Sequence, residues 1–169
     1  MKYKSVNNFI GKELVEGGGE KLDVCSPLDG SVISQVILST SDAVDKAVQT
    51  AKAAFPSWSE TPIKERVQVF FRYKRLFEEN MDELTKLVQE ENGKTYDEAK
   101  AEVLKSAELT EFASSMPQLI SGELLEVSKD VERRVEYFPL GVVASISPLI
   151  SLTWFQTGQS QMRWYSVTR

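Results

Sequence analysis

The sequence contains no histidine and only one cysteine, Cys25. Histidine is the usual general base near neutral pH and the commonest metal ligand in proteins. Its absence excludes Ser-His-Asp and Cys-His catalytic arrangements, and zinc hydrolase sites built on histidine, within this chain. A single cysteine also excludes an internal disulfide bond.

Long apolar runs and dense basic clusters are also lacking. The longest apolar run, residues 140–146, is far shorter than the roughly 18 residues that a membrane-spanning helix needs. Residues 1–5 carry charge with no apolar stretch behind them, and 25 acidic residues against 20 basic ones give a formal net charge of -5. These features predict a cytoplasmic protein with neither a membrane nor a nucleic acid as partner.

The composition that is present is typical of a soluble globular protein. Apolar residues make up 41% of the sequence and charged residues 27%, which excludes a collagenous or wholly disordered chain. A length of 169 residues is enough for one domain with a core.

The first forty residues predict a small antiparallel unit. Short segments rich in apolar and β-branched residues indicate strands over 9–15, 21–24 and 31–37. The run Gly17-Gly18-Gly19 is expected to form a turn between the first two.

Apolar residues at helical spacing then predict four amphipathic helices in a row. Their expected boundaries are Thr40 or Ser41 to Pro56, Thr61 or Pro62 onward, Asn80 to Gly93, and Thr95 or Asp97 to a point before Pro117. The residues expected on the apolar sides of the last three are Ile63, Val67, Phe70, Phe71 and Phe77, then Leu84, Leu87 and Val88, then Ala99, Val103, Ala107 and Phe112.

Three further strands are expected after the helices. Residues 124–127 and 131–137 suggest exposed or edge strands. Residues 141–148 are apolar at both alternating sets of positions, as in a strand inside a parallel sheet. The expected fold class is therefore α/β, with only the first parallel strand present, because residues 149–169 show neither helical nor strand periodicity.

The side chains with reactive chemistry all have a plain structural interpretation. Cys25 lies beside a turn with no histidine to activate it, so we expect a small buried or half-buried residue. The pairs Glu78-Glu79 and Glu90-Glu91 diverge on their helices and predict solvated faces. Gly17-Gly18-Gly19 precedes a strand rather than a helix, unlike a phosphate-binding loop. We predict no catalytic residue and no metal ligand.

Several segments resemble the aldehyde dehydrogenase family in the right order and spacing. They are Asn8 to Lys12, Ser26-Pro27 with Gly30, Glu91-Asn92-Gly93-Lys94-Thr95 with the helix after it, and Pro139-Leu140-Gly141-Val142-Val143-Ala144-Ser145-Ile146-Ser147-Pro148. The stretch from Phe112 to Glu132 is most similar to methylmalonate-semialdehyde dehydrogenases of the CoA-acylating type. The resemblance implies strands and helices that flank the cofactor domain of this family.

The resemblance also implies a chemistry, which needs residues outside this match. The family oxidises an aldehyde through a cysteine thiolate, with hydride transfer to NAD and release of an acid or acyl-CoA. The family's oxyanion-stabilising asparagine would fall at Ile150, which has no donor. Only main-chain positions near Ser147 and Leu149 correspond to cofactor contacts, and they are vestigial, so we expect this chain to bind no NAD. Family members are homo-oligomers, which implies that this chain can self-associate.

The tail is explained by a shifted reading frame. Deleting one T from TTT AAT TTC CCT, which encodes the family's Phe-Asn-Phe-Pro, gives the Leu-Ile-Ser-Leu found at 149–152. The same back-reading lets Trp154, Phe155 and Gln156 encode Met-Val-Pro. We therefore expect a partial dehydrogenase domain over 1–148 and an out-of-frame tail over 149–169.

Three hypotheses for function follow. The first is a truncated, inactive relative of an NAD-dependent semialdehyde dehydrogenase, or the translation of a pseudogene. The second is a non-catalytic module that pairs with full-length dehydrogenase subunits through the strand at 131–137. The third, a complete small enzyme, is disfavoured by the absent histidine and by the position of Cys25.

Overall fold

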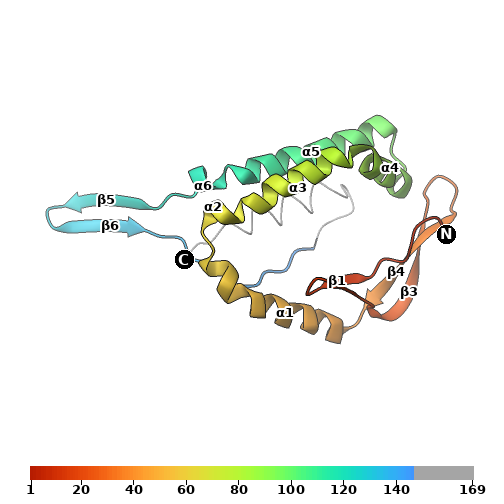
Figure 1. Ribbon diagram of the computed structural model, residues 1–169, viewed down its shortest axis with the longest axis horizontal. Coiled ribbons are helices and arrows are strands. Elements are labelled where there is room, and N and C mark those ends of the chain that lie inside the picture. The colour runs from red at the N-terminus through yellow and green to blue at the C-terminus, as the bar shows by residue number, and fades with distance from the viewer. Residues whose placement is uncertain (147–169) are drawn as a thin grey trace. The chain divides into compact units, whose positions relative to one another are not determined.

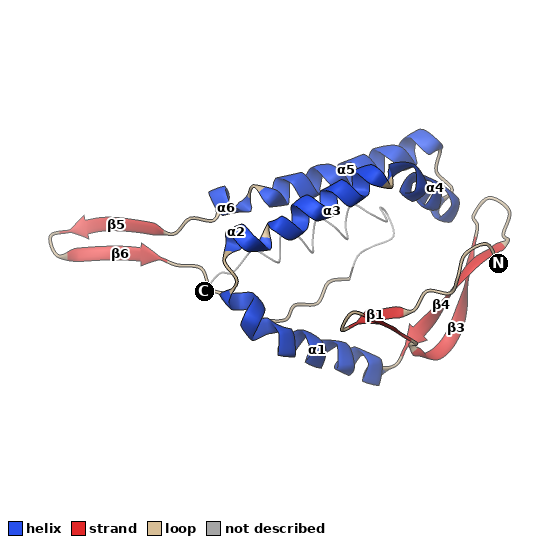
Figure 2. Cartoon of the chain, viewed as in Figure 1, coloured by secondary structure: helices blue, strands red, loops and turns tan. Residues whose placement is uncertain are grey.

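The computed structural model describes residues 1–146, which form two compact units. The first unit comprises residues 1–58 and 82–100, and the second comprises residues 59–81 together with 101–146. Figures 1 and 2 show the order of helices and strands along the chain. The described chain is mixed α/β, and each of its three sheets is a pair of antiparallel strands.

The N-terminal strands belong to the first unit. β1 (Asn8–Ile10) and β2 (Glu13–Val15) form a short hairpin. Its two-residue turn holds Gly11 at φ +62° and Lys12 at φ +74°, as a type I′ turn requires. The segment expected as one strand over 9–15 is thus two strands that fold back on each other.

A longer ribbon follows, formed by β3 (Gly18–Cys25) and β4 (Val32–Ser39). The prediction of a turn over Gly17-Gly18-Gly19 was wrong at its end, because Gly18 and Gly19 begin β3. A Cβ atom at Gly19 would overlap the backbone carbonyl of Leu38. Glycine is needed here for close approach of two strands rather than for a turn.

Helix α1 (Ser41–Glu60) begins where the sequence predicts and ends later. The Thr40 hydroxyl accepts a hydrogen bond from the Ala43 amide at 3.4 Å, which confirms the N-cap. Pro56 does not stop the helix, which contains it and continues for a further turn. A proline inside a helix lacks the backbone N–H that would bond to the carbonyl four residues earlier, and its ring crowds that carbonyl. This destabilises the helix but does not require it to end.

The remaining helix of the first unit is α4 (Met81–Asn92), which is followed by α5 (Tyr96–Ser114). The Asn80 side chain does not cap α4, because its amide donates to the Leu76 carbonyl of the preceding helix at 2.8 Å. Thr95 and Glu98 form a reciprocal capping box at the start of α5, with the Thr95 amide 3.0 Å from the Glu98 carboxylate.

The second unit contains α2 (Ile63–Arg66), α3 (Gln68–Glu79) and α6 (Met116–Leu119). Its small core consists of Val67, Phe70 and Ala113, with Ile63, Met116 and Ile120 packed against it. Phe77 is also buried, whereas Phe71 and Phe112, which were expected to face inward, are half exposed. Their neighbours Phe70 and Ala113 take the inward positions instead.

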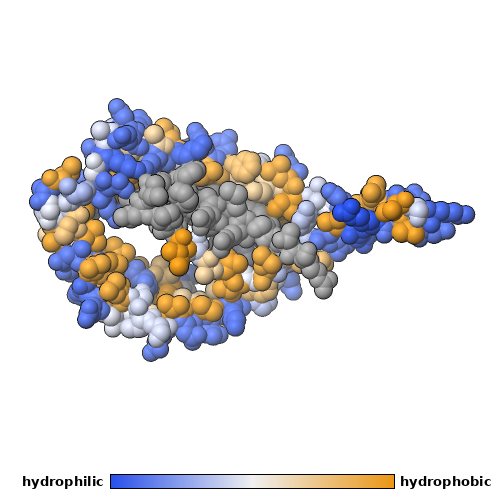
Figure 3. All heavy atoms as spheres, turned by 180° about the vertical axis from the view of Figure 1, so that it is seen from behind, coloured by the Kyte–Doolittle hydropathy of each residue, from blue (hydrophilic) through white to orange (hydrophobic). Residues whose placement is uncertain are grey.

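A two-stranded arm completes the described chain, formed by β5 (Glu123–Ser128) and β6 (Val131–Val135). Every residue of β5 is exposed, which confirms the prediction of exposed strands, and apolar side chains lie among charged ones on its surface (Figure 3). Residues 141–146, expected as the first strand of a parallel sheet, lie outside any strand. A parallel strand needs hydrogen-bonded neighbours, and the described residues supply none for it.

None of the helices between residues 1 and 146 combines the length and hydropathy that crossing a bilayer would take.

Candidate functional site

The positions that the sequence associates with a cofactor are Ser147 and Leu149. Both lie outside the described residues, as does the predicted tail over 149–169. The groups of the described chain with candidate chemistry are its cysteine, its carboxylates and a pocket in the second unit.

Cys25 is the last residue of β3, opposite Val32. The expectation of a buried or half-buried cysteine was wrong, because the side chain is exposed. The register of β3 against β4 is irregular between Val24 and Cys25, and such an irregularity re-aims the side chain that follows it.

The carboxylates of the described residues do not assemble into a metal site. Nowhere between residues 1 and 146 do three or more Cys, Asp or Glu side chains gather closely enough to hold a metal ion. The sequence itself supplies no histidine to such a group.

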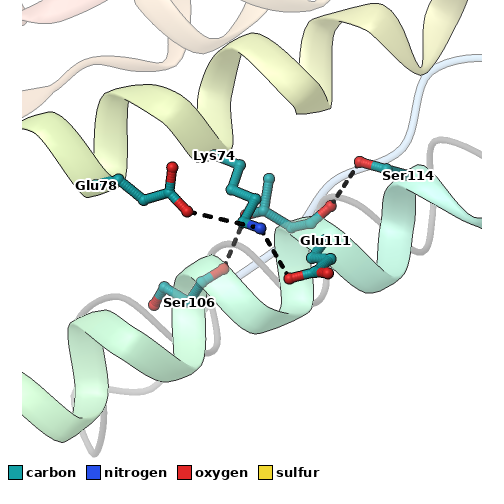
Figure 4. Close-up of polar contacts among 6 residues, drawn as sticks. Lys74, Glu78, Ser106, Glu111 and Ser114 are labelled. Carbon is teal, nitrogen blue, oxygen red and sulfur yellow. Dashed lines mark hydrogen bonds and ion pairs between the residues drawn. The ribbon is translucent and has the colours of Figure 1, made fainter.

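Glu78 and Glu79 pair with cations on their own helix, α3. Glu78 lies 3.6 Å from the ammonium of Lys74 (Figure 4). Glu79 lies 3.3 Å from Arg75. Lys74 also contacts Glu111 of α5 at 2.9 Å, and this hydrogen bond raises the pKa of Lys74 above its usual value. The two carboxylates are more than half exposed, which confirms the prediction of a solvated face. Both form ion pairs with a residue four positions earlier on the same helix.

Glu90 departs from the prediction of a merely solvated side chain. Its carboxylate accepts hydrogen bonds from Lys2 Nζ at 2.6 Å and from Tyr3 Oη at 2.7 Å. These bonds, Lys2 first and Tyr3 second, lower the pKa of Glu90. Its neighbour Glu91 is exposed and follows the prediction. Sequence reasoning missed this cluster because no local pattern signals a contact between residues 87 or 88 positions apart.

A pocket of about 520 Å³ lies in the second unit, between the start of α2 and the base of the β5–β6 arm. Ile63 and Ile120 form part of its apolar wall, and Glu60, Arg66 and Tyr137 contribute polar groups. The Nε of Arg66 is buried and donates no hydrogen bond within the part of the chain that the structure describes. The volume falls within the range of small-molecule sites.

The pocket does not bring together the parts of a catalytic site. Ser59 lies in its lining, but the sequence has no histidine to pair with it, so the pocket holds no Ser-His arrangement. It offers an apolar wall and one guanidinium, which is the chemistry of a binding surface.

The glycine run over residues 17–19 does not form a dinucleotide-binding turn. A pyrophosphate is normally held by a glycine-rich turn that leads from a strand into a helix. Here the glycine run leads into β3, and Gly19 is packed against the backbone of β4. No residue between 1 and 146 is therefore assigned to NAD.

Comparisons with known proteins place these features in context. Residues 14–149 match the model of the aldehyde dehydrogenase family. A malonate-semialdehyde dehydrogenase from Oceanobacillus iheyensis is 42% identical over 147 residues, which make up 86% of this chain and 30% of that protein. A malonate-semialdehyde dehydrogenase from Geobacillus kaustophilus is 41% identical, again over 86% of this chain and 30% of its own length.

Solved structures show the same relationship. The methylmalonate-semialdehyde dehydrogenase of Oceanimonas doudoroffii matches with a TM-score of 0.91 and 30% identity, covering 98% of this chain and 34% of that chain. PnpE from Pseudomonas sp. WBC-3, solved also in complex with nicotinamide adenine dinucleotide, matches in that complex with a TM-score of 0.88 and 28% identity, covering 96% of this chain and 34% of its own. The chain thus spans about a third of the length of the relatives it matches.

Proposed function

The chain belongs to the aldehyde dehydrogenase family, and from this premise we propose that it is the N-terminal portion of an NAD-dependent semialdehyde dehydrogenase that carries no catalysis of its own. The observation that supports the proposal is the setting of Cys25, the only thiol in the sequence, which lies exposed at the end of β3 in a chain that has no histidine to activate it. A thiolate mechanism needs a nucleophile, a base and an oxyanion donor around one substrate position.

The substrate class of the intact enzyme follows from the relatives. Apart from PnpE, those quoted above are named malonate-semialdehyde and methylmalonate-semialdehyde dehydrogenases. We assign to the intact enzyme a short aldehyde that bears a carboxylate, oxidised with NAD to an acid or an acyl-CoA. In the intact enzyme the described residues would scaffold the site, because none of them is assigned to NAD or to a reacting atom.

A frameshift accounts for the residues beyond 148. The family match ends at residue 149, close to the point where the back-reading places a lost base. In this proposal residues 1–148 are the remnant of the dehydrogenase and residues 149–169 are translated out of frame. Sequencing the genomic locus tests it: one T inserted before the Leu149 codon should restore Phe-Asn-Phe-Pro and open a dehydrogenase frame downstream. A flank without such coding would remove the frameshift from consideration.

Catalysis is tested on the purified chain with malonate semialdehyde and NAD, with and without CoA. We expect no formation of NADH, and Cys25→Ser should leave that result unchanged. A full-length semialdehyde dehydrogenase serves as the positive control. Turnover that persists after contaminating enzyme is removed, and that Cys25→Ser abolishes, would overturn the proposal.

The exposed arm favours a second candidate function, a non-catalytic module that pairs with full-length dehydrogenase subunits. β5 and β6 pair only with each other among the described elements, so each strand keeps one edge open for a further strand. Co-expression of the chain with a tagged full-length relative tests this function. Retention of the chain on the tagged protein, and its loss when Arg133 is replaced by proline, would favour this candidate over an inert fragment.

A further inference from the structure

The N-terminal residues lie along an edge of β4 that β3 does not occupy. The amides of Lys2 and Tyr3 donate to the Ile33 carbonyl at 3.0 and 2.8 Å, and the Val6 amide donates to the Gln35 carbonyl at 2.8 Å. Val6 also forms a parallel bridge with Val36. Residues 2–6 therefore cover the second edge of β4 as a short extended segment.

Side chains hold the same segment at its ends. The hydroxyl of Ser34, a buried residue, donates to the Lys4 carbonyl at 2.8 Å. Beyond β4, the carboxylate of Glu90 on α4 receives Lys2 on one oxygen and Tyr3 on the other. A single side chain on a helix thus joins two consecutive residues of the segment to the rest of the first unit.

The charges around Glu90 favour its ionised form. Lys2 and Tyr3 face it from the N-terminal segment, and Lys86 lies near it on α4. Hydrogen bonds from Lys2 and Tyr3 lower the pKa of Glu90, and the bond to Glu90 raises the pKa values of Lys2 and Tyr3. A lowered carboxyl pKa contributes stability above the unfolded value of 4.5 that is lost as the pH falls through the folded value.

We propose that residues 2–6 form a detachable strap over the edge of β4, held shut by the carboxylate of Glu90 and released when that carboxylate is neutralised. The contacts of the strap are few: three backbone amides, one buried hydroxyl and one shared carboxylate. Segments with few buried contacts open independently of the remaining structure. Release uncovers the edge of β4, and an open strand edge is a template for pairing with another chain.

Amide hydrogen exchange of the full chain tests the strap, with protection measured at Tyr3 and Val6 and, as an internal reference, at the amides of β3. At neutral pH we expect Glu90→Gln to lower protection of Tyr3 and Val6 about fivefold, in keeping with the loss of one charge-assisted contact. Glu91→Gln is the matched control, since it removes the same charge one residue away at an exposed position. It should leave Tyr3 and Val6 unchanged.

The pH dependence provides the second readout. In the unaltered chain, protection of Tyr3 and Val6 should fall as the pH drops below 4.5 through the pKa of Glu90, while β3 stays protected. Glu90→Gln should abolish that step. Tyr3→Phe, which removes the hydrogen bond that the Tyr3 hydroxyl donates to Glu90, should give a smaller loss of protection at the same amides. Equal protection in Glu90→Gln and Glu91→Gln, or loss of the strap only together with β3, would overturn the proposal.

Discussion

Replacing Phe70 by alanine should unfold the second unit far more readily than the same change at the next residue. Phe70 is 6% exposed and packs with Val67 and Ala113, which are 4% and 1% exposed. Phe71, one position along α3, is 52% exposed. The two variants delete the same atoms from the same helix and differ only in where those atoms lie.

The magnitude follows from burial. Phe70→Ala loses the transfer free energy of an almost fully buried ring and leaves a cavity in the core, which together cost about 3–5 kcal/mol. Phe71→Ala loses roughly half of the transfer free energy and leaves no enclosed cavity, so about 1 kcal/mol is expected. The difference of about 2 kcal/mol or more should move the urea midpoint by about 1 M, for a dependence of about 2 kcal/mol per M.

Urea titration followed by far-ultraviolet circular dichroism measures both variants, because both units contain helices. Hydrogen exchange of α3 amides then assigns the loss to the second unit. Equal midpoints for Phe70→Ala and Phe71→Ala would refute the packing described for α3. A larger loss for Phe71→Ala would mean that the half-exposed ring is covered in solution, for example by another copy of the chain.

Two other predictions concern the backbone and the surface. Gly93→Ala should lower the free energy of unfolding by about 1–2 kcal/mol, because Gly93 has φ +71° and a Cβ there would lie 2.8 Å from Pro27 Cγ. Gly30→Ala, with a similar φ and open space around it, is the control for the backbone strain alone. An equal loss of stability at both sites would exclude the Pro27 contact as a cause. The chain should also self-associate with rising concentration, because the apolar side chains of Val143 and Ile146 are 45% and 93% exposed. Analytical ultracentrifugation should show that Val143→Lys shifts the chain toward monomer. A monodisperse unaltered chain would contradict this prediction.

Local signals in the sequence were sufficient where short-range chemistry decides the structure. The start of α1 at Thr40 and the start of α5 at Thr95 each follow from a hydroxyl that caps the first turn. β6 follows from the alternation that begins at Val131. These features depend on residues within about four positions of one another.

Local sequence signals failed where a residue far away in the sequence determines burial or pairing. Helical spacing placed Phe71 and Phe112 on an apolar side, but spacing does not say which part of that side a neighbouring helix covers. The contact of Glu90 with Tyr3 spans 87 positions and leaves no local trace. The strand expected over 141–146 has the composition of a buried parallel strand, yet composition cannot provide the neighbours that a strand must pair with.

The hydroxyl-bearing face of α5 has a consequence for redesign. Ser106, Thr110 and Ser114 donate to the carbonyls of Glu102, Ser106 and Thr110 at 3.1, 2.8 and 3.0 Å. Each of these hydroxyl groups thus donates to a carbonyl of its own helix. This face of α5 can therefore pack like an apolar surface, although its residues are polar in the sequence. Designers who seek a more stable scaffold can exchange Ser114 for alanine, since the Thr110 carbonyl that accepts its hydroxyl keeps its place in the helical ladder.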